Sequence, residues 1–102
     1  MDRFLALADP TRRRIVELLG SGEQGAGAIG AHFPVSPPAI SQHLKTLRES
    51  GLVRVRTEGQ RRIYSLDPDG LAEMEAWFAR IRGFWGDRLD ALERELNKED
   101  EK

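Results

Sequence analysis

The segment from residue 36 to residue 66 constrains the fold of this 102-residue chain more than any other part of it. It opens with Ser36-Pro37-Pro38, a pattern typical of a helix start, because a serine side chain caps the first turn and proline is tolerated at the first helical position. Apolar residues then recur at the spacing of one helix face, at Ile40, Leu44 and Leu47. Gly51 stands where such a helix ends. The segment therefore begins with a helix that buries one narrow face and leaves its polar face open.

A basic β-hairpin follows this helix, over residues 52–66. Val53-Arg54-Val55-Arg56 alternates between apolar and charged residues, which indicates a strand with one packed face and one solvated face. Thr57-Glu58-Gly59-Gln60 is typical of a turn, and the run from Arg61 to Leu66 returns as a second strand. We expect the tip and outer face of the hairpin to carry four arginines, Arg54, Arg56, Arg61 and Arg62.

Two helices are predicted before residue 36. Asp9-Pro10-Thr11 begins the first, whose buried face holds Ile15, Leu18 and Leu19, and Gly20-Ser21-Gly22 ends it. A shorter apolar helix runs from about Ala26 to Phe33, and Pro34 closes it because proline cannot continue the hydrogen-bond ladder. The order of elements is helix, helix, helix, hairpin and a last long helix.

The last helix runs roughly from residue 68 to residue 96 and is apolar over a wide band. Its main stripe steps by threes and fours through Leu71, Met74, Phe78, Ile81, Trp85, Leu89, Leu92 and Leu96, and Trp77 and Phe84 add a second stripe beside it. This band is wider than one small core needs, so we expect it to form a subunit interface; the alternative is a helix wrapped deeper into its own domain. We expect one domain over residues 1–97 and a disordered polar tail over residues 98–102.

Charge and residue types narrow the function. The formal net charge is −1, but residues 1–66 carry a net of +4 and residues 67–102 a net of −5, which indicates a polyanionic partner on one side, or else a chance asymmetry. The chain has no cysteine, so it has no disulfide, thiolate metal site or cysteine nucleophile. His32 and His43 lie on different predicted helices without metal-ligand spacing, and no hydrolytic triad is visible. We expect no enzyme activity, metal or cofactor, no membrane span, and a cytoplasmic location.

Residues 26–50 have the layout of a helix-turn-helix, whose second helix lies in the DNA major groove. Gln42 can pair with adenine, and Ser41 can hydrogen-bond to either base of a pair. Pro38 or Ala39 can touch a thymine methyl group. Phosphate contacts suit residues further along the helix and on the hairpin, and His43 either reaches DNA or packs under the hairpin. An ordinary solvated helix face is the alternative. The candidate DNA-binding residues are Ser36, Pro38, Ala39, Ser41, Gln42, His43, Lys45, Thr46, Arg48, Arg54, Arg56, Arg61 and Arg62.

Three strings, ALADPTRRRIVELL, SPPAISQHLKTLRESGLV and VRTEGQRRIYSLDPDGL, resemble the winged helix-turn-helix repressors of the ArsR/SmtB family over about residues 4 to 96. The resemblance implies a mainly α fold with a small β-hairpin, and a homodimer built from the first and last helices. It also implies a repressor or autorepressor that binds an inverted-repeat operator with the recognition helix Ser36–Ser50 and the wing Arg54–Arg62. The implied dimer interface comprises Phe4, Leu5, Trp77, Phe78, Ile81, Phe84, Trp85, Leu89 and Leu92.

The sequence also departs from the family's metal sensors. Where those sensors carry a Cys-x-Cys type of site, this chain has GAGAIGAHF, in which only His32 is of a residue type that binds metals. Its last helix contains no histidine. It therefore resembles the cysteine-free branch, whose inducers are often unidentified. Two other functions stay open: a winged-helix module that binds a protein through the hairpin and last helix, and a sensor whose small-molecule pocket is lined by Trp77, Phe84 and Trp85.

Overall fold

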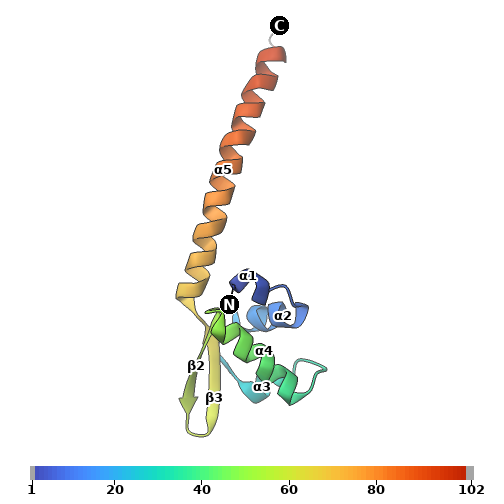
Figure 1. Ribbon diagram of the computed structural model, residues 1–102, viewed down its shortest axis with the longest axis vertical. Helices are drawn as coiled ribbons and strands as arrows, with labels where there is room; N and C mark the ends of the chain where they lie inside the picture. The colour runs from blue at the N-terminus through green and yellow to red at the C-terminus, as the bar shows by residue number, and fades with distance from the viewer. Residues whose placement is uncertain (1, 101–102) are drawn as a thin grey trace. The chain divides into compact units, whose positions relative to one another are not determined.

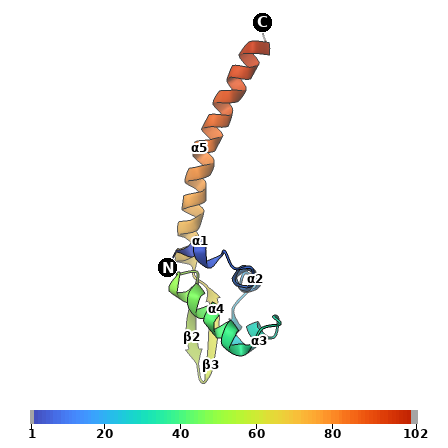
Figure 2. The same cartoon turned by 45° about the vertical axis from the view of Figure 1, so that its right-hand side comes forward.

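The computed structural model describes residues 2–100, which divide into two units, one ending at Ala72 and one beginning at Glu73. The first unit holds the winged part and the second holds most of the last helix, both within the single domain predicted over residues 1–97. The elements, drawn in Figure 1 and turned in Figure 2, are α1 (Arg3–Ala6), α2 (Pro10–Leu19), β1 (Gln24–Gly25), α3 (Ala26–Gly30), α4 (Pro37–Glu49), β2 (Val53–Glu58), β3 (Arg61–Leu66) and α5 (Pro68–Asp100).

The capping signals in the sequence place the helix starts correctly. The Asp9 carboxylate accepts a hydrogen bond from the backbone N–H of Arg12 at 3.0 Å and begins α2. The Ser36 hydroxyl accepts one from the backbone N–H of Ala39 at 3.3 Å and begins α4. Both helices have proline in their first turn, where its missing N–H costs nothing. The predicted starts of α2 and α4 are therefore confirmed.

The core lies between α2, α3, α4 and the sheet, within the first unit. The predicted stripe of α4 is buried, and so are Ile15 and Leu19 of α2, whereas Leu18 is half-buried. The buried apolar residues of the described chain are Ala6, Ile15, Leu19, Ile29, Ile40, Leu44, Leu47, Leu52, Val53, Ile63 and Tyr64.

The sheet has three antiparallel strands in the order β1-β3-β2, one more than the hairpin predicted from the sequence. The added strand is two residues long and pairs Gln24 with Tyr64 and Gly25 with Ile63. The hairpin turn is Gly59-Gln60 alone, tighter than the expected four-residue turn, because the strands pair as far as Glu58 and Arg61. Gly59 has φ 62°, a conformation that glycine adopts without the steric cost of a side chain.

Other boundaries differ from the predictions. The short helix α1 was not expected as a separate element, and α3 ends at Gly30 rather than near Phe33. Helix α5 runs without interruption past Gly83 and Gly86 to Asp100, so the expected tail is helical at residues 98–100, while residues 101 and 102 lie outside the described residues. Among the described residues, no helix combines the length and apolar character that crossing a lipid bilayer requires.

The end of α4 meets the start of α5 through backbone atoms, within the first unit. Gly51 follows α4 with φ 79°, in the left-handed region that favours glycine. Gly70 is buried, and a Cβ added to it would overlap the carbonyl group of Gly51. The guanidinium group of Arg3 lies over the same place. No side chain larger than hydrogen fits at position 70 without a shift of the backbone.

We predict that Gly70→Ala lowers the free energy of unfolding by about 1–3 kcal/mol, the usual cost of overpacking. The matched control is Gly83→Ala, because a Cβ there meets nothing within 4 Å and alanine favours the helix by up to about 1 kcal/mol. Urea unfolding followed by circular dichroism measures both changes. Equal effects of the two substitutions would contradict the close contact between Gly51 and Gly70.

Candidate nucleic-acid interface

The polar residues of α4 divide into two flanks. Ser41, Gln42, Lys45 and Arg48 are exposed on one flank and line an open groove with two residues of β3 and the first residue of α3. Glu49, at the end of α4, is exposed and is not one of the lining residues. The other flank holds Ala39, His43 and Thr46, all half-buried. The groove is therefore formed by one flank of the helix and one face of the wing, and its lining residues are Ala26, Pro38, Ser41, Gln42, Lys45, Arg48, Arg62 and Tyr64.

The arginines of the hairpin, predicted at its tip and outer face, lie on both faces of the two strands. Residues directly opposite in an antiparallel pair project to the same side of a sheet, and successive residues to opposite sides. The register pairs Arg54 with Ser65, Arg56 with Ile63 and Glu58 with Arg61. Arg54, Arg56 and Arg61 therefore lie on one face. Arg62 lies on the other, with Tyr64, on the groove side.

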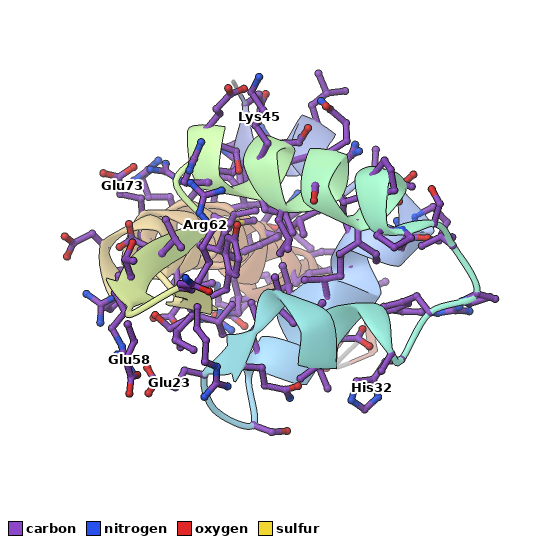
Figure 3. The ribbon with its side chains drawn as sticks, turned by 90° about the horizontal axis from the view of Figure 1, so that it is seen from below. Glu23, His32, Lys45, Glu58, Arg62 and Glu73 are labelled. Carbon is purple, nitrogen blue, oxygen red and sulfur yellow. The ribbon has the colours of Figure 1, made fainter. Side chains whose placement is uncertain are left out.

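The groove is cationic. Lys45 and Arg48 of α4 and Arg62 of β3 contribute three positive charges, and none of its lining residues is acidic. Figure 3 shows Lys45 and Arg62 from two different elements on the same side of the molecule. Gln42 and Ser41 lie exposed between these charges and the N-terminus of α4. The groove thus combines charges that attract a polyanion with neutral groups that donate and accept hydrogen bonds.

His43 lies against α2, so it is not under the wing. Its Nδ1 atom is 3.4 Å from Nη1 of Arg12. Because a guanidinium group only donates hydrogen bonds, Nδ1 is the acceptor in this contact. Arg12 also donates through Nε to the carbonyl oxygen of Ala6. One side chain of α2 therefore connects the end of α1 with α4, and no sequence pattern indicated this link.

Arg56 has two carboxylate partners on the face of the wing opposite Arg62. Its Nη2 atom lies 2.6 Å from Oε1 of Glu23, and its Nη1 atom 2.8 Å from Oε2 of Glu58. Hydrogen bonding to Arg56 lowers the pKa of Glu23, and the two carboxylates raise the pKa of Arg56. Arg56 was predicted as a DNA-binding residue, but its partner Glu23, which precedes β1 and is 33 residues away, was not predicted.

The apolar stripe of α5 is exposed within its own unit. Trp77, Phe78, Ile81, Phe84, Trp85, Leu89, Leu92 and Leu96 are each at least 40% exposed. The rings of Trp77 and Phe78 pack edge to face, with centroids 5.2 Å apart, and the guanidinium carbon of Arg88 lies 4.4 Å from the ring centre of Phe84. In the first unit, Phe4 and Leu5 of α1 are 40% and 62% exposed. All of the candidate interface residues thus present apolar surface.

The residue types that bind metals do not gather. In the part of the chain that the structure describes, no three histidine, aspartate or glutamate side chains are grouped to hold an ion. His32 is exposed on the turn after α3 and points away from the groove (Figure 3).

A helix-turn-helix followed by a β-hairpin wing, with a cationic groove between them, defines a winged-helix protein. The family model described as "Bacterial regulatory protein, arsR family" matches residues 9–55, from the cap of α2 into β2. The HTH-type transcriptional regulator Rv2034 of Mycobacterium tuberculosis is 50% identical over 80 residues, which cover 78% of this chain and 72% of that protein. The transcriptional repressor SdpR of Bacillus subtilis is 40% identical over 74 residues, which cover 72% of this chain and 82% of that protein.

Solved structures agree with these relatives. A crystal structure described as a possible transcriptional regulator for arsenical resistance is 50% identical, with a TM-score of 0.74 over 89% of this chain and 95% of that one. The homodimeric winged helix-turn-helix DNA-binding domain Mb0332 of Mycobacterium bovis is 31% identical, with a TM-score of 0.62 over 76% of this chain and 72% of that one. The chain belongs to the ArsR family of bacterial regulatory proteins. It is a transcriptional regulator and not an enzyme.

We predict that the cap at Asp9 makes stability depend on pH. The hydrogen bond from the backbone N–H of Arg12 lowers the pKa of Asp9 from its usual 3.8. A lowered pKa stabilises the fold above the unfolded-state value, and this contribution is lost as the pH falls through the folded-state value. Asp9→Ala should therefore cost about 1 kcal/mol near pH 7 and progressively less below about pH 3.8.

Thermal unfolding of the wild type and the variant, compared at about pH 7 and about pH 3, measures this difference. Asp9→Asn is the control, because asparagine keeps the cap and removes the charge. A cost of Asp9→Ala that stays constant between these two pH values would contradict the assignment.

Proposed function

We propose that the protein is a homodimeric repressor that binds an inverted-repeat operator, including one at its own gene, and that α4 enters the major groove of DNA. The observation that carries the proposal is the groove between α4 and the wing, where Lys45, Arg48 and Arg62 surround the exposed Ser41 and Gln42. Membership in a family of transcriptional regulators supports it. Binding to the bacterial chromosome places the protein in the cytoplasm.

The residues of the site take different roles. Gln42 pairs with adenine, Ser41 bonds to a neighbouring base, and Pro38 contacts a thymine methyl group. Lys45, Arg48 and Arg62 bind phosphates, which position the protein without reading sequence. Ala39, His43 and Thr46, half-buried on the other flank, contribute only with their exposed edges. Ser36 acts through its cap on α4. Arg54 and Arg61, on the other face of the wing, reach the DNA backbone beside the operator half-site.

In the proposed dimer, the two subunits contact one another through the apolar stripe of α5 and through Phe4 and Leu5 of α1. An exposed apolar stripe along a helix that runs from Pro68 to Asp100 marks an interaction surface. The structural relative from Mycobacterium bovis is a homodimer, which supports a second copy as the occupant. A two-fold dimer presents two recognition helices, and this symmetry matches an inverted repeat whose half-sites lie about one helical turn apart.

Fluorescence anisotropy with the gene's own upstream region and a scrambled duplex tests the proposed function. We expect the upstream duplex to bind at least about a thousandfold more tightly, and both affinities to fall steeply with salt. Equal, weak binding to both duplexes would contradict autoregulation. An absence of binding to either duplex at low salt would contradict the DNA-binding function itself.

Two substitutions in the groove should separate base readout from phosphate binding. Gln42→Ala should lower affinity for the operator by about 1–3 kcal/mol and leave binding to the scrambled duplex unchanged, because only base contacts are lost. Arg62→Ala should weaken binding to both duplexes alike, because one phosphate contact is lost. The slope of log affinity against log salt concentration should become shallower by about 0.9.

Lys98→Gln, at the far end of α5, controls for the loss of a positive charge. An Arg62→Ala variant with the affinity and salt dependence of the wild type would contradict the role of the wing.

A charge placed in the apolar stripe should separate the subunits. Trp85 is 55% exposed in the single chain, and Trp85→Glu would bury an unpaired carboxylate between two copies. We expect a monomer by sedimentation equilibrium. Ala76→Glu, on the opposite side of the same helix by its 100° spacing, is the control and should remain dimeric. Circular dichroism confirms that both variants fold, and a dimeric Trp85→Glu variant would contradict this interface.

A further inference from the structure

The wing carries an ion-pair cluster on the face that the groove does not use. Arg56 of β2 contacts Glu23, which lies just before β1, and Glu58, which lies at the tip of the wing. Glu23 contacts it twice, with 2.6 Å from Nη2 to Oε1 and 3.4 Å from Nε to Oε2. Figure 3 shows Glu23 and Glu58 next to one another, away from Lys45. We refer to Glu23, Arg56 and Glu58 as the wing cluster.

The two carboxylates of the wing cluster occupy the N–H groups of Arg56 that would otherwise bind a phosphate. An arginine binds a phosphate or carboxylate best through two parallel N–H groups on one edge. Glu23 takes the edge formed by Nε and Nη2, and Glu58 takes Nη1. A phosphate therefore competes with both carboxylates for Arg56, and the two negative charges also repel it.

The charges of the cluster differ from those of the groove. One guanidinium group and two carboxylates sum to a net charge of −1 for the wing cluster, whereas the groove gathers three cations and no acid. The pKa of Glu23 is lowered and that of Arg56 is raised, so this pair is charged at neutral pH. The side chains are about half exposed, so a neighbouring polyanion can reach them.

We propose that Glu23 and Glu58 withhold Arg56 from DNA and thereby limit the affinity of the protein for DNA of any sequence. This inference rests on the proposed DNA-binding function. Glu23 is the main positioning residue, because it lies outside the hairpin and holds Arg56 toward β1. Of the four arginines of the wing, Arg54, Arg61 and Arg62 are thus available to DNA, and the charge of Arg56 is cancelled within the protein.

A double-mutant cycle with Glu23→Gln and Arg56→Gln tests the proposal. Affinity is measured by anisotropy for the upstream and scrambled duplexes over a series of salt concentrations. Glu23→Gln should raise affinity for both duplexes severalfold and make the salt dependence steeper, because Arg56 becomes available to phosphate. Adding Glu58→Gln should bring the gain in affinity to about tenfold near 50 mM salt. The slope of log affinity against log salt concentration should become steeper by about 0.9.

The gain should vanish when Arg56 is also replaced, since it requires that guanidinium group. Glu17→Gln is the matched control, because Glu17 is an exposed acid on α2, outside the wing cluster, and its loss changes the net charge by the same amount. Arg56→Gln alone should leave the salt dependence at the wild-type value.

Two outcomes overturn the proposal. A gain from Glu23→Gln that persists in the Arg56→Gln background would show a general effect of net charge. A loss of affinity in Glu23→Gln would show that the cluster only supports the shape of the wing. The wild type in the same titration distinguishes this proposal from the proposed function. If the wild type binds neither duplex at low salt, the DNA-binding function is contradicted and not the role of Glu23.

Discussion

The burial of one side of α4 is the constraint on which the rest of the structure depends. Ile40, Leu44 and Leu47 are each at most 3% exposed, and the helix packs on α2, α3 and β2 through them. Removing a buried leucine from such a face costs about 2–5 kcal/mol, which is a large part of the stability of a small domain. The polar side of α4 is therefore held in place by apolar contacts that take no part in recognition.

Local signals in the sequence predicted the hairpin and every helix except α1, because their causes are local. Asp9 and Ser36 each cap a turn within three residues of themselves, and proline follows at once. Helix spacing likewise separates the stripe of α4 from its polar side. The strand β1 could not be predicted, because two residues carry no periodic pattern and their pairing with β3 depends on the rest of the fold.

The arrangement of the candidate site could be predicted from the sequence only in part. Alternation along β3 requires Arg61 and Arg62 to face opposite sides, so their separation follows from a local rule. The contact of Arg56 with Glu23 spans 33 residues and that of His43 with Arg12 spans 31. No local sequence pattern predicts contacts over such separations. Charge counted along the sequence shows that the front of the chain is basic, but only the folded register shows which cations are already paired.

The contact between Gly51 and Gly70 has a consequence for how such a protein can change over generations. Position 70 has room for hydrogen alone, so nearly every substitution there disturbs the junction between α4 and α5. Ser41 and Gln42 are exposed and support no part of the core, so replacements there leave the packing intact. Under the proposed function, new DNA-sequence preferences can therefore arise by single substitutions at the surface of α4, while the frame that presents them stays fixed.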